Sequence, residues 1–73
     1  MKEKNPISII FGANVKYLRL SRGLTQEHLA ELSNCHPNYI GAVERGERNI
    51  TIIKVANIAN ALNCRISDLL EGI

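Results

Sequence analysis

Signals for the start and the end of short helices follow one another along the whole chain of 73 residues. Asn5-Pro6 is typical of a helix start, because Asn caps free N–H groups and Pro fits the first turn. Gly23 and Gly46 are typical of helix ends, where the backbone turns left-handed. Apolar residues between these signals recur every three or four positions, and no useful length alternates with the period of a strand. The sequence therefore predicts an all-α fold.

We expect five helices in one compact domain. Their predicted spans are residues 7–22, 26–33, 37–45, 52–62 and 66–70, within a domain at 7–73 that follows a flexible arm at 1–6. Hydrophobic residues make up 45% of the chain and charged residues 22%, which is ordinary for a globular protein and excludes intrinsic disorder. No apolar run approaches the roughly 20 residues of a membrane span, and no signal peptide is recognisable. We expect a cytoplasmic protein.

Enzyme chemistry is not expected from this chain. A domain this small has little room for a deep cleft, and no Ser/His/Asp or Cys/His set is convincing. Cys35 and Cys64 match no zinc spacing, and we expect them to be reduced and to act as small hydrophobes. We take His28 as an exposed helix residue. No cofactor and no metal site are predicted.

The most informative stretch is the predicted helix-turn-helix at residues 25–45. Ala30 is small enough to let the next helix cross closely above it. Asn34 tolerates the left-handed turn that must follow. Ile40 and Val43 lie one turn apart and seat the third helix on the first two. A steep crossing after so short a turn defines this motif.

These residues resemble the helix-turn-helix regulators of the phage repressor and Cro family, also called the XRE family. The matching residues are Leu24-Thr25-Gln26-Glu27, Leu29-Ala30, Tyr39-Ile40, Val43-Glu44-Arg45-Gly46, Arg48-Asn49, Ala59, Leu62 and Ser67-Asp68-Leu69-Leu70. The resemblance covers about residues 9–70 and implies a lambda-repressor-like DNA-binding domain. Tyr39-Ile40-Gly41 and the stretch 44–49 resemble the controller proteins of restriction–modification systems. Three residues depart from the family pattern. Asn34 stands where the family usually has Gly, Pro37 where it often has Gln or Arg, and Ile50 where it often has Pro.

The third helix presents a small, polar face to a DNA groove or to solvent. Asn38, Gly41, Ala42 and Arg45 share that face, opposite Ile40. A mid-helix Gly costs about 1 kcal/mol relative to Ala, so Gly41 indicates close approach by something. The predicted base-reading residues are His36, Pro37, Asn38 and Ala42. Asn suits adenine, and Pro or Ala suits a thymine methyl group.

Phosphate contacts are expected from helix ends more than from net charge, which is only +2. The predicted helix starts at Thr25, His36 and Thr51 offer free N–H groups and a partial positive charge. For Thr25 and Thr51 the alternative role is to cap their helices without any contact to DNA. The candidate phosphate contacts are Thr25, Gln26, Tyr39, Arg45, Arg48, Asn49 and Thr51.

Two further assignments concern structure and assembly. The resemblance implies a largely buried ion pair between Arg19 and Glu44.

The end of the chain contains three apolar residues, Leu69, Leu70 and Ile73, and one helical turn cannot bury all three. We expect a homodimer interface formed by Ile58, Ile66, Leu69, Leu70 and Ile73. The alternative is that Leu69 fills the core while the other two fray.

Together these patterns predict a DNA-binding transcriptional regulator. It would bind double-stranded DNA as a homodimer on a palindromic operator, would regulate its own promoter, and would lie with the nucleoid. No small-molecule effector is evident. The alternative from another class is an antitoxin or other protein-interaction module that uses the same fold. An antitoxin usually needs an extra arm or tail, and the chain ends at Ile73, which favours the DNA-binding regulator.

Overall fold

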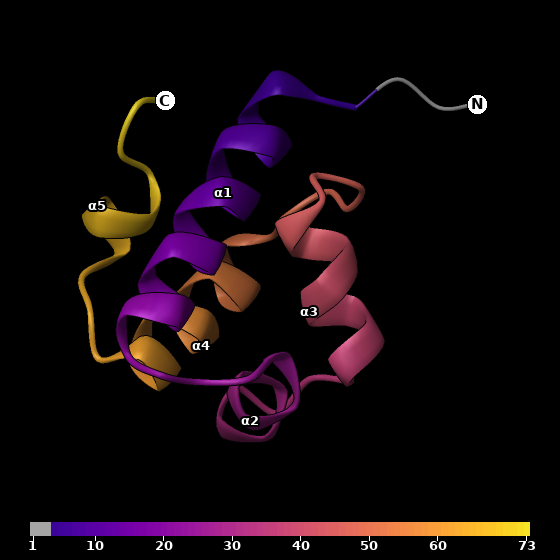
Figure 1. Cartoon of the computed structure of the whole chain (residues 1–73). Helices are drawn as coiled ribbons and strands as arrows, with labels where there is room; N and C mark the ends of the chain where they lie inside the picture. Colours follow the sequence, from indigo (N-terminus) through magenta and orange to yellow (C-terminus); the bar gives the residue numbers. More distant parts are fainter. Residues whose placement is uncertain (1–3) are drawn as a thin grey trace.

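The computed structural model describes residues 4–73, which form five α-helices and no strand (Figure 1). The helices are α1 (Pro6–Ser21), α2 (Gln26–Leu32), α3 (Pro37–Glu44), α4 (Ile52–Leu62) and α5 (Ile66–Leu69). The predicted all-α, five-helix fold is confirmed. Of the arm predicted at 1–6, residues 1–3 lie outside the described part, while Asn5 and Pro6 already belong to the start of α1.

The helix boundaries follow from the capping residues. The Asn5 side chain accepts the Ile7 N–H at 2.8 Å, and Pro6 occupies the first turn. Thr25 and Thr51 accept N–H groups of α2 and α4 in the same way. Between α2 and α3, Asn34 adopts a φ of +57°, the left-handed turn that the sequence predicts there. This short turn lets α3 cross α2 within a few residues.

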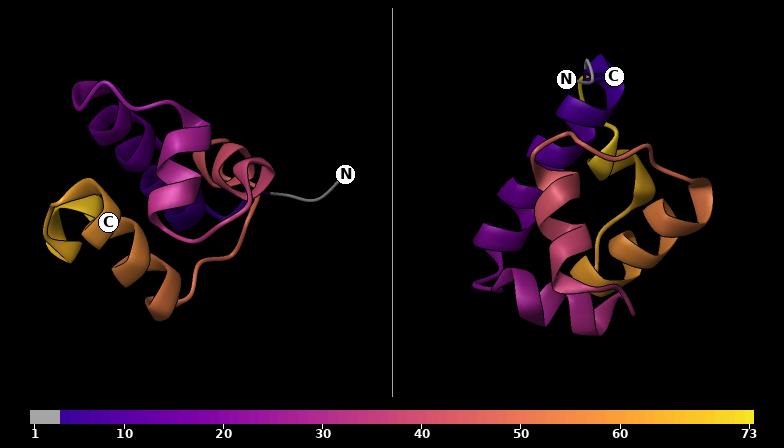
Figure 2. Two further views of the ribbon diagram at one scale, coloured as in Figure 1. Left: turned by 90° about the horizontal axis from the view of Figure 1, so that it is seen from below. Right: turned by 90° about the vertical axis from the view of Figure 1, so that its right-hand side faces the viewer.

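The helices form two groups on either side of the core. α2 and α3 lie on one side and α4 and α5 on the other, with the long α1 running past both (Figures 1 and 2). α1 contacts α3, α4 and α5. The buried side chains that meet in the middle include Phe11, Val15, Leu29, Ile40 and Leu62. No helix within residues 4–73 is long and apolar enough to cross a membrane.

α1 crosses α3 at Gly12. A Cβ atom built on Gly12 would lie 2.0 Å from the carbonyl oxygen of Val43, far inside van der Waals contact. Only glycine lets the two backbones approach this closely. The crossing fixes the position of α3, and the sequence analysis did not single it out.

The end of the chain is held against α1 by one side chain. The Asn14 amide nitrogen donates to the carbonyl oxygens of Leu69 and Glu71, both at 2.9 Å. This anchor seats the single turn of α5 on the core, where Leu69 is fully buried. Ile58 on α4 is buried in the same core.

The burial of Ile58 and Leu69 corrects part of the predicted dimer interface. Neither side chain is available to a second copy, because each already packs within its own domain. Ile66 and Ile73 remain 38% and 53% exposed, and Leu70 is half-buried. The single turn of α5 buries its last residue, Leu69, as the alternative interpretation held, while Ile73 stays exposed.

Candidate nucleic-acid interface

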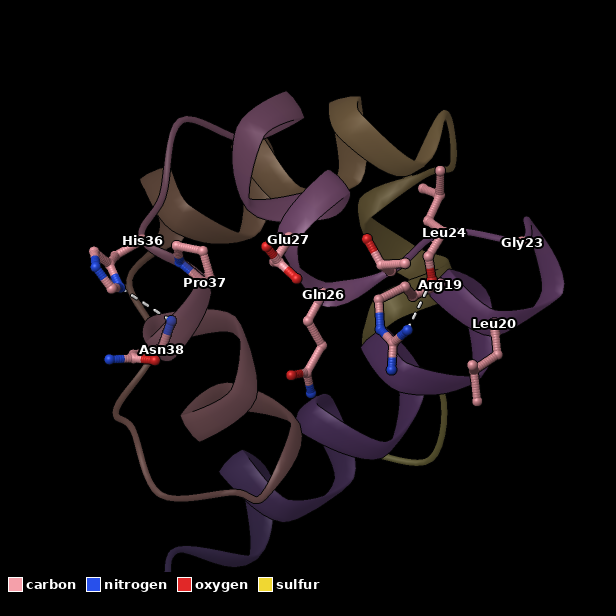
Figure 3. Close-up of a pocket in the computed structure, with 10 residues that line it drawn as sticks. Arg19, Leu20, Gly23, Leu24, Gln26, Glu27, His36, Pro37 and Asn38 are labelled. Carbon is pink, nitrogen blue, oxygen red and sulfur yellow. Dashed lines mark hydrogen bonds between the residues drawn. The ribbon is translucent and has the colours of Figure 1, made fainter.

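The N-terminal ends of α2 and α3 open onto one groove (Figure 3). The end of α1 and the turn after it form one wall, and the start of α3 forms the other. The residues lining it are Arg19, Leu20, Gly23, Leu24, Thr25, Gln26, Glu27, His36, Pro37 and Asn38. Three of the predicted base-reading residues and two of the predicted phosphate contacts therefore lie together.

Both helices that face this groove start at a capped N-terminus. The Thr25 hydroxyl accepts the His28 N–H at 3.0 Å, and His36 Nδ1 accepts the Asn38 N–H at 3.1 Å. Each cap satisfies one of the free N–H groups and leaves others open to solvent. The partial positive charge of a helix N-terminus favours an anion such as a phosphate group.

The predicted base-reading residues divide into two groups. His36 and Asn38 are exposed and Pro37 is half-buried at the groove. Ala42, the fourth predicted base-reading residue, is only 8% exposed and is not part of the groove lining, so the structure does not bring it together with the other three. The Glu47 N–H donates to the Ala42 carbonyl at 2.9 Å, a backbone bond that closes the end of α3.

Gly41 is buried by this protein's own side chains. A Cβ atom on Gly41 would lie 3.2 Å from Arg45 Nη1 and 3.5 Å from Gln26 Oε1. Because Gly41 has no Cβ atom, Gln26 of α2 can lie against α3. The close approach inferred from the sequence is thus an internal contact between the two helices.

A buried polar network links the three helices behind the groove. Arg19 Nε donates to Glu44 Oε2 at 2.6 Å, in an ion pair whose side chains are 8% and 3% exposed. Arg19 also donates to the Leu24 carbonyl at 2.7 Å. The Gln26 amide nitrogen donates to Glu44 Oε1 at 3.0 Å. The structure thus contains the ion pair implied by the family resemblance, and adds Gln26, which the sequence suggested only as a phosphate contact.

The remaining phosphate candidates cluster around Tyr39 and the turn after α3. The Arg48 guanidinium lies 5.3 Å and Lys54 Nζ 5.4 Å from the centre of the Tyr39 ring. Burial raises the pKa of the Tyr39 phenol and Cys35 raises it further, while Lys54 and Arg48 act in the opposite direction. The hydroxyl therefore keeps its proton and can donate a hydrogen bond.

The other residues of this group are exposed. Arg45 pairs with Glu47 at 3.1 Å, and Asn49 and Thr51 lie on the surface of the connection to α4. Lys54 was not among the phosphate contacts predicted from the sequence. A positive charge three residues after the Thr51 cap, in the first turn of a predicted helix, was the available signal for such a contact.

The thiols and possible metal ligands of the described residues form no cluster. Cys35 and Cys64 are free and half-buried, and each packs against the core. Burial raises the pKa of the Cys64 thiol, Arg22 lowers it and Asp68 raises it. Within residues 4–73 no group of three or more His, Cys, Asp or Glu side chains is placed to hold a metal ion.

Two short helices joined by a tight turn, with the start of the second helix at the surface, form the architecture of a helix-turn-helix DNA-binding domain. Residues 15–69 match the helix-turn-helix family model. The chain is 45% identical over 64 residues to the control protein C.SmaI of Serratia marcescens, spanning 88% of this chain and 76% of that protein. It is 38% identical over 68 residues to the control protein C.BamHI of Bacillus amyloliquefaciens, spanning 92% of this chain and 84% of that protein.

A solved structure agrees with these sequence matches. The restriction-modification controller protein C.AhdI from Aeromonas hydrophila superposes with a TM-score of 0.83 at 39% identity, covering 85% of this chain and 94% of that one. The chain belongs to the helix-turn-helix family of the phage repressor and Cro type, a family of DNA-binding transcription regulators.

Proposed function

We propose that this regulator binds a palindromic operator as a homodimer and controls its own promoter, as the controller of a restriction–modification system. The observation that carries the proposal is the groove in which His36 and Asn38 stand exposed at the free N-terminus of α3. The similarity to control proteins from two bacteria supports the restriction–modification setting. Such a regulator acts in the cytoplasm, on the DNA of the nucleoid.

In this proposal the start of α3 reads the bases from the major groove. The exposed Asn38 amide suits adenine, to whose N6 and N7 it can bond with both of its polar atoms. Half-buried Pro37 offers an apolar surface to a thymine methyl group. Thr25 at the start of α2 lies in the same groove and binds a phosphate group through its free helix end.

The turn after α3 supplies the second set of phosphate contacts. Arg48 and Lys54 place two positive charges beside the Tyr39 ring, and the protonated Tyr39 hydroxyl adds a donor. Arg45, Asn49 and Thr51 continue this surface toward α4. Contacts of this kind hold the protein in register and carry no sequence information of their own.

Dimerisation is proposed because one recognition helix contacts only a few base pairs. A two-fold dimer doubles those contacts and places half-sites one DNA turn apart, about 34 Å. Exposed Ile66 and Ile73, with half-buried Leu70, form the candidate interface. Ile52 and Ile53, which are 71% and 69% exposed at the start of α4, form a second apolar surface that the sequence analysis did not single out.

The decisive experiment is selection of bound duplexes from a random DNA pool, combined with sedimentation of the free protein. We expect enrichment of two inverted half-sites and a dimer at tens of micromolar. A pool without enrichment would contradict sequence-specific binding. Enrichment of a single unrepeated half-site by a monomer would contradict the dimer.

A further inference from the structure

The N-cap of α3 is a histidine, and its ring is held by the backbone. His36 Nδ1 accepts the Asn38 N–H at 3.1 Å, whereas α2 and α4 are capped by threonine hydroxyls. A ring nitrogen that accepts this bond carries no proton itself. With Nδ1 as the acceptor of this bond, the ring N–H is on Nε2.

The same bond sets the direction in which that proton points. The two nitrogens lie on opposite sides of the imidazole ring, so a ring whose Nδ1 faces the helix end directs Nε2–H away from it. Figure 3 shows the His36 ring at the edge of the groove, outside Pro37 and above the Asn38 side chain. The side chain is exposed, and no bond from Nε2 to another residue is formed within residues 4–73.

The neighbouring position adds no competing donor. Pro37, the first residue of α3, has no N–H group and a purely apolar side chain. His36 thus presents one hydrogen-bond donor and no outward acceptor, next to the Asn38 amide, which has both. A side chain of this kind distinguishes bases by whether they offer an acceptor.

We infer that His36 is a specificity-determining residue that donates through Nε2 to a guanine in each half-site; the inference rests on the proposed function. In the major groove guanine presents two acceptors, N7 and O6. Adenine and thymine each present one acceptor, beside an amino or a methyl group, and cytosine presents only a donor. The donor-only edge of His36 therefore favours guanine, which offers two acceptors, over adenine and thymine, which offer one, and disfavours cytosine, which offers none.

The test compares the base preferences of three proteins in selection from a random pool. His36→Ser keeps a side-chain oxygen for the Asn38 N–H, because Ser is a favourable N-cap, but it is too short to reach a base. His28→Ser makes the same change on an exposed α2 residue outside the groove. Circular dichroism establishes that both variants keep the helices.

We expect the wild type and His28→Ser to prefer guanine at one position of each half-site by about 3- to 10-fold, the effect of one hydrogen bond. His36→Ser is expected to lose that preference while the other positions and the salt dependence stay the same. If His36→Ser instead bound all DNA sequences more weakly to the same extent, with a smaller slope of affinity against salt concentration, His36 would be a phosphate contact and the inference would be overturned. Unchanged preferences, or a lost preference for another base, would overturn it too. If the wild type itself selects no sequence, the proposed function fails instead.

Discussion

The backbone of Gly12 in α1 lies directly against the carbonyl oxygen of Val43 in α3, so closely that a Cβ atom would stand 2.0 Å from that oxygen. No side-chain rotation can relieve such a clash, because the obstacle is backbone. The contact sets how closely α1 packs against α3.

Gly12→Ala is therefore expected to destabilise the fold by about 3 kcal/mol or more, at the upper end of overpacking effects. Urea unfolding followed by circular dichroism measures this. Ala13→Ser, on the adjacent exposed position of the same helix, is the matched control and is expected to change the stability by less than about 0.5 kcal/mol. Equal stability of Gly12→Ala and the wild type would contradict the close crossing.

Removing Glu44 is expected to cost about 3–5 kcal/mol, since it leaves the buried Arg19 guanidinium without its partner. The same change frees the Gln26 amide that Glu44 holds. The double variant Arg19→Met with Glu44→Leu, which removes both charges, is expected to recover most of that loss. Thermal unfolding of the wild type, Glu44→Ala and the double variant checks this. A Glu44→Ala variant that melts with the wild type would show that the pair contributes nothing.

Asn38 and Arg48 are expected to differ in how they affect DNA binding. Asn38→Ala should weaken binding to the selected operator by about 1–3 kcal/mol and relax the preference at one base pair. Arg48→Ala should weaken binding to all sequences about equally and reduce the slope of affinity against salt concentration. Titrations of operator and random DNA at several salt concentrations separate the two. If both variants behaved alike, the division into base and phosphate contacts would be wrong.

The double variant Ile66→Asp with Ile73→Asp is expected to give a folded monomer that binds the operator weakly. Both side chains are exposed, so the charges fall on the surface and leave the core intact. Sedimentation and operator titration measure the outcome. Ile52→Asp with Ile53→Asp is the comparison, because it places the same charges on the other exposed apolar pair. If only Ile52→Asp with Ile53→Asp abolished the dimer, the interface would lie at the start of α4 and not at α5.

Local features of the fold were predictable from the sequence because their causes are local. Asn5, Thr25 and Thr51 cap helices through groups two or three residues away. Asn34 takes the left-handed turn that its residue type tolerates. These signals gave the number of helices and placed their ends within a few residues.

The errors arose where a distant segment decides the outcome. Ala42 is on the expected helix face, but it is only 8% exposed in the folded domain. Leu69 is buried because Asn14, 55 positions earlier, holds the last turn in place. Gly41 accommodates a side chain from another helix. Helical periodicity describes one helix at a time and contains no information on such contacts.

The two hydrogen bonds from Asn14 to the end of the chain have a consequence for the spacing of an operator. They join the candidate dimer surface to α1, and the close contact at Gly12 joins α1 to α3. We therefore expect the surface and α3 to move together, and a dimer built from such domains to hold its two α3 helices at a fixed distance. One added base pair between half-sites moves the second site by about 3.4 Å and rotates it by roughly 35°. Because these contacts within residues 4–73 leave little freedom to follow that rotation, we expect the DNA to twist or bend instead.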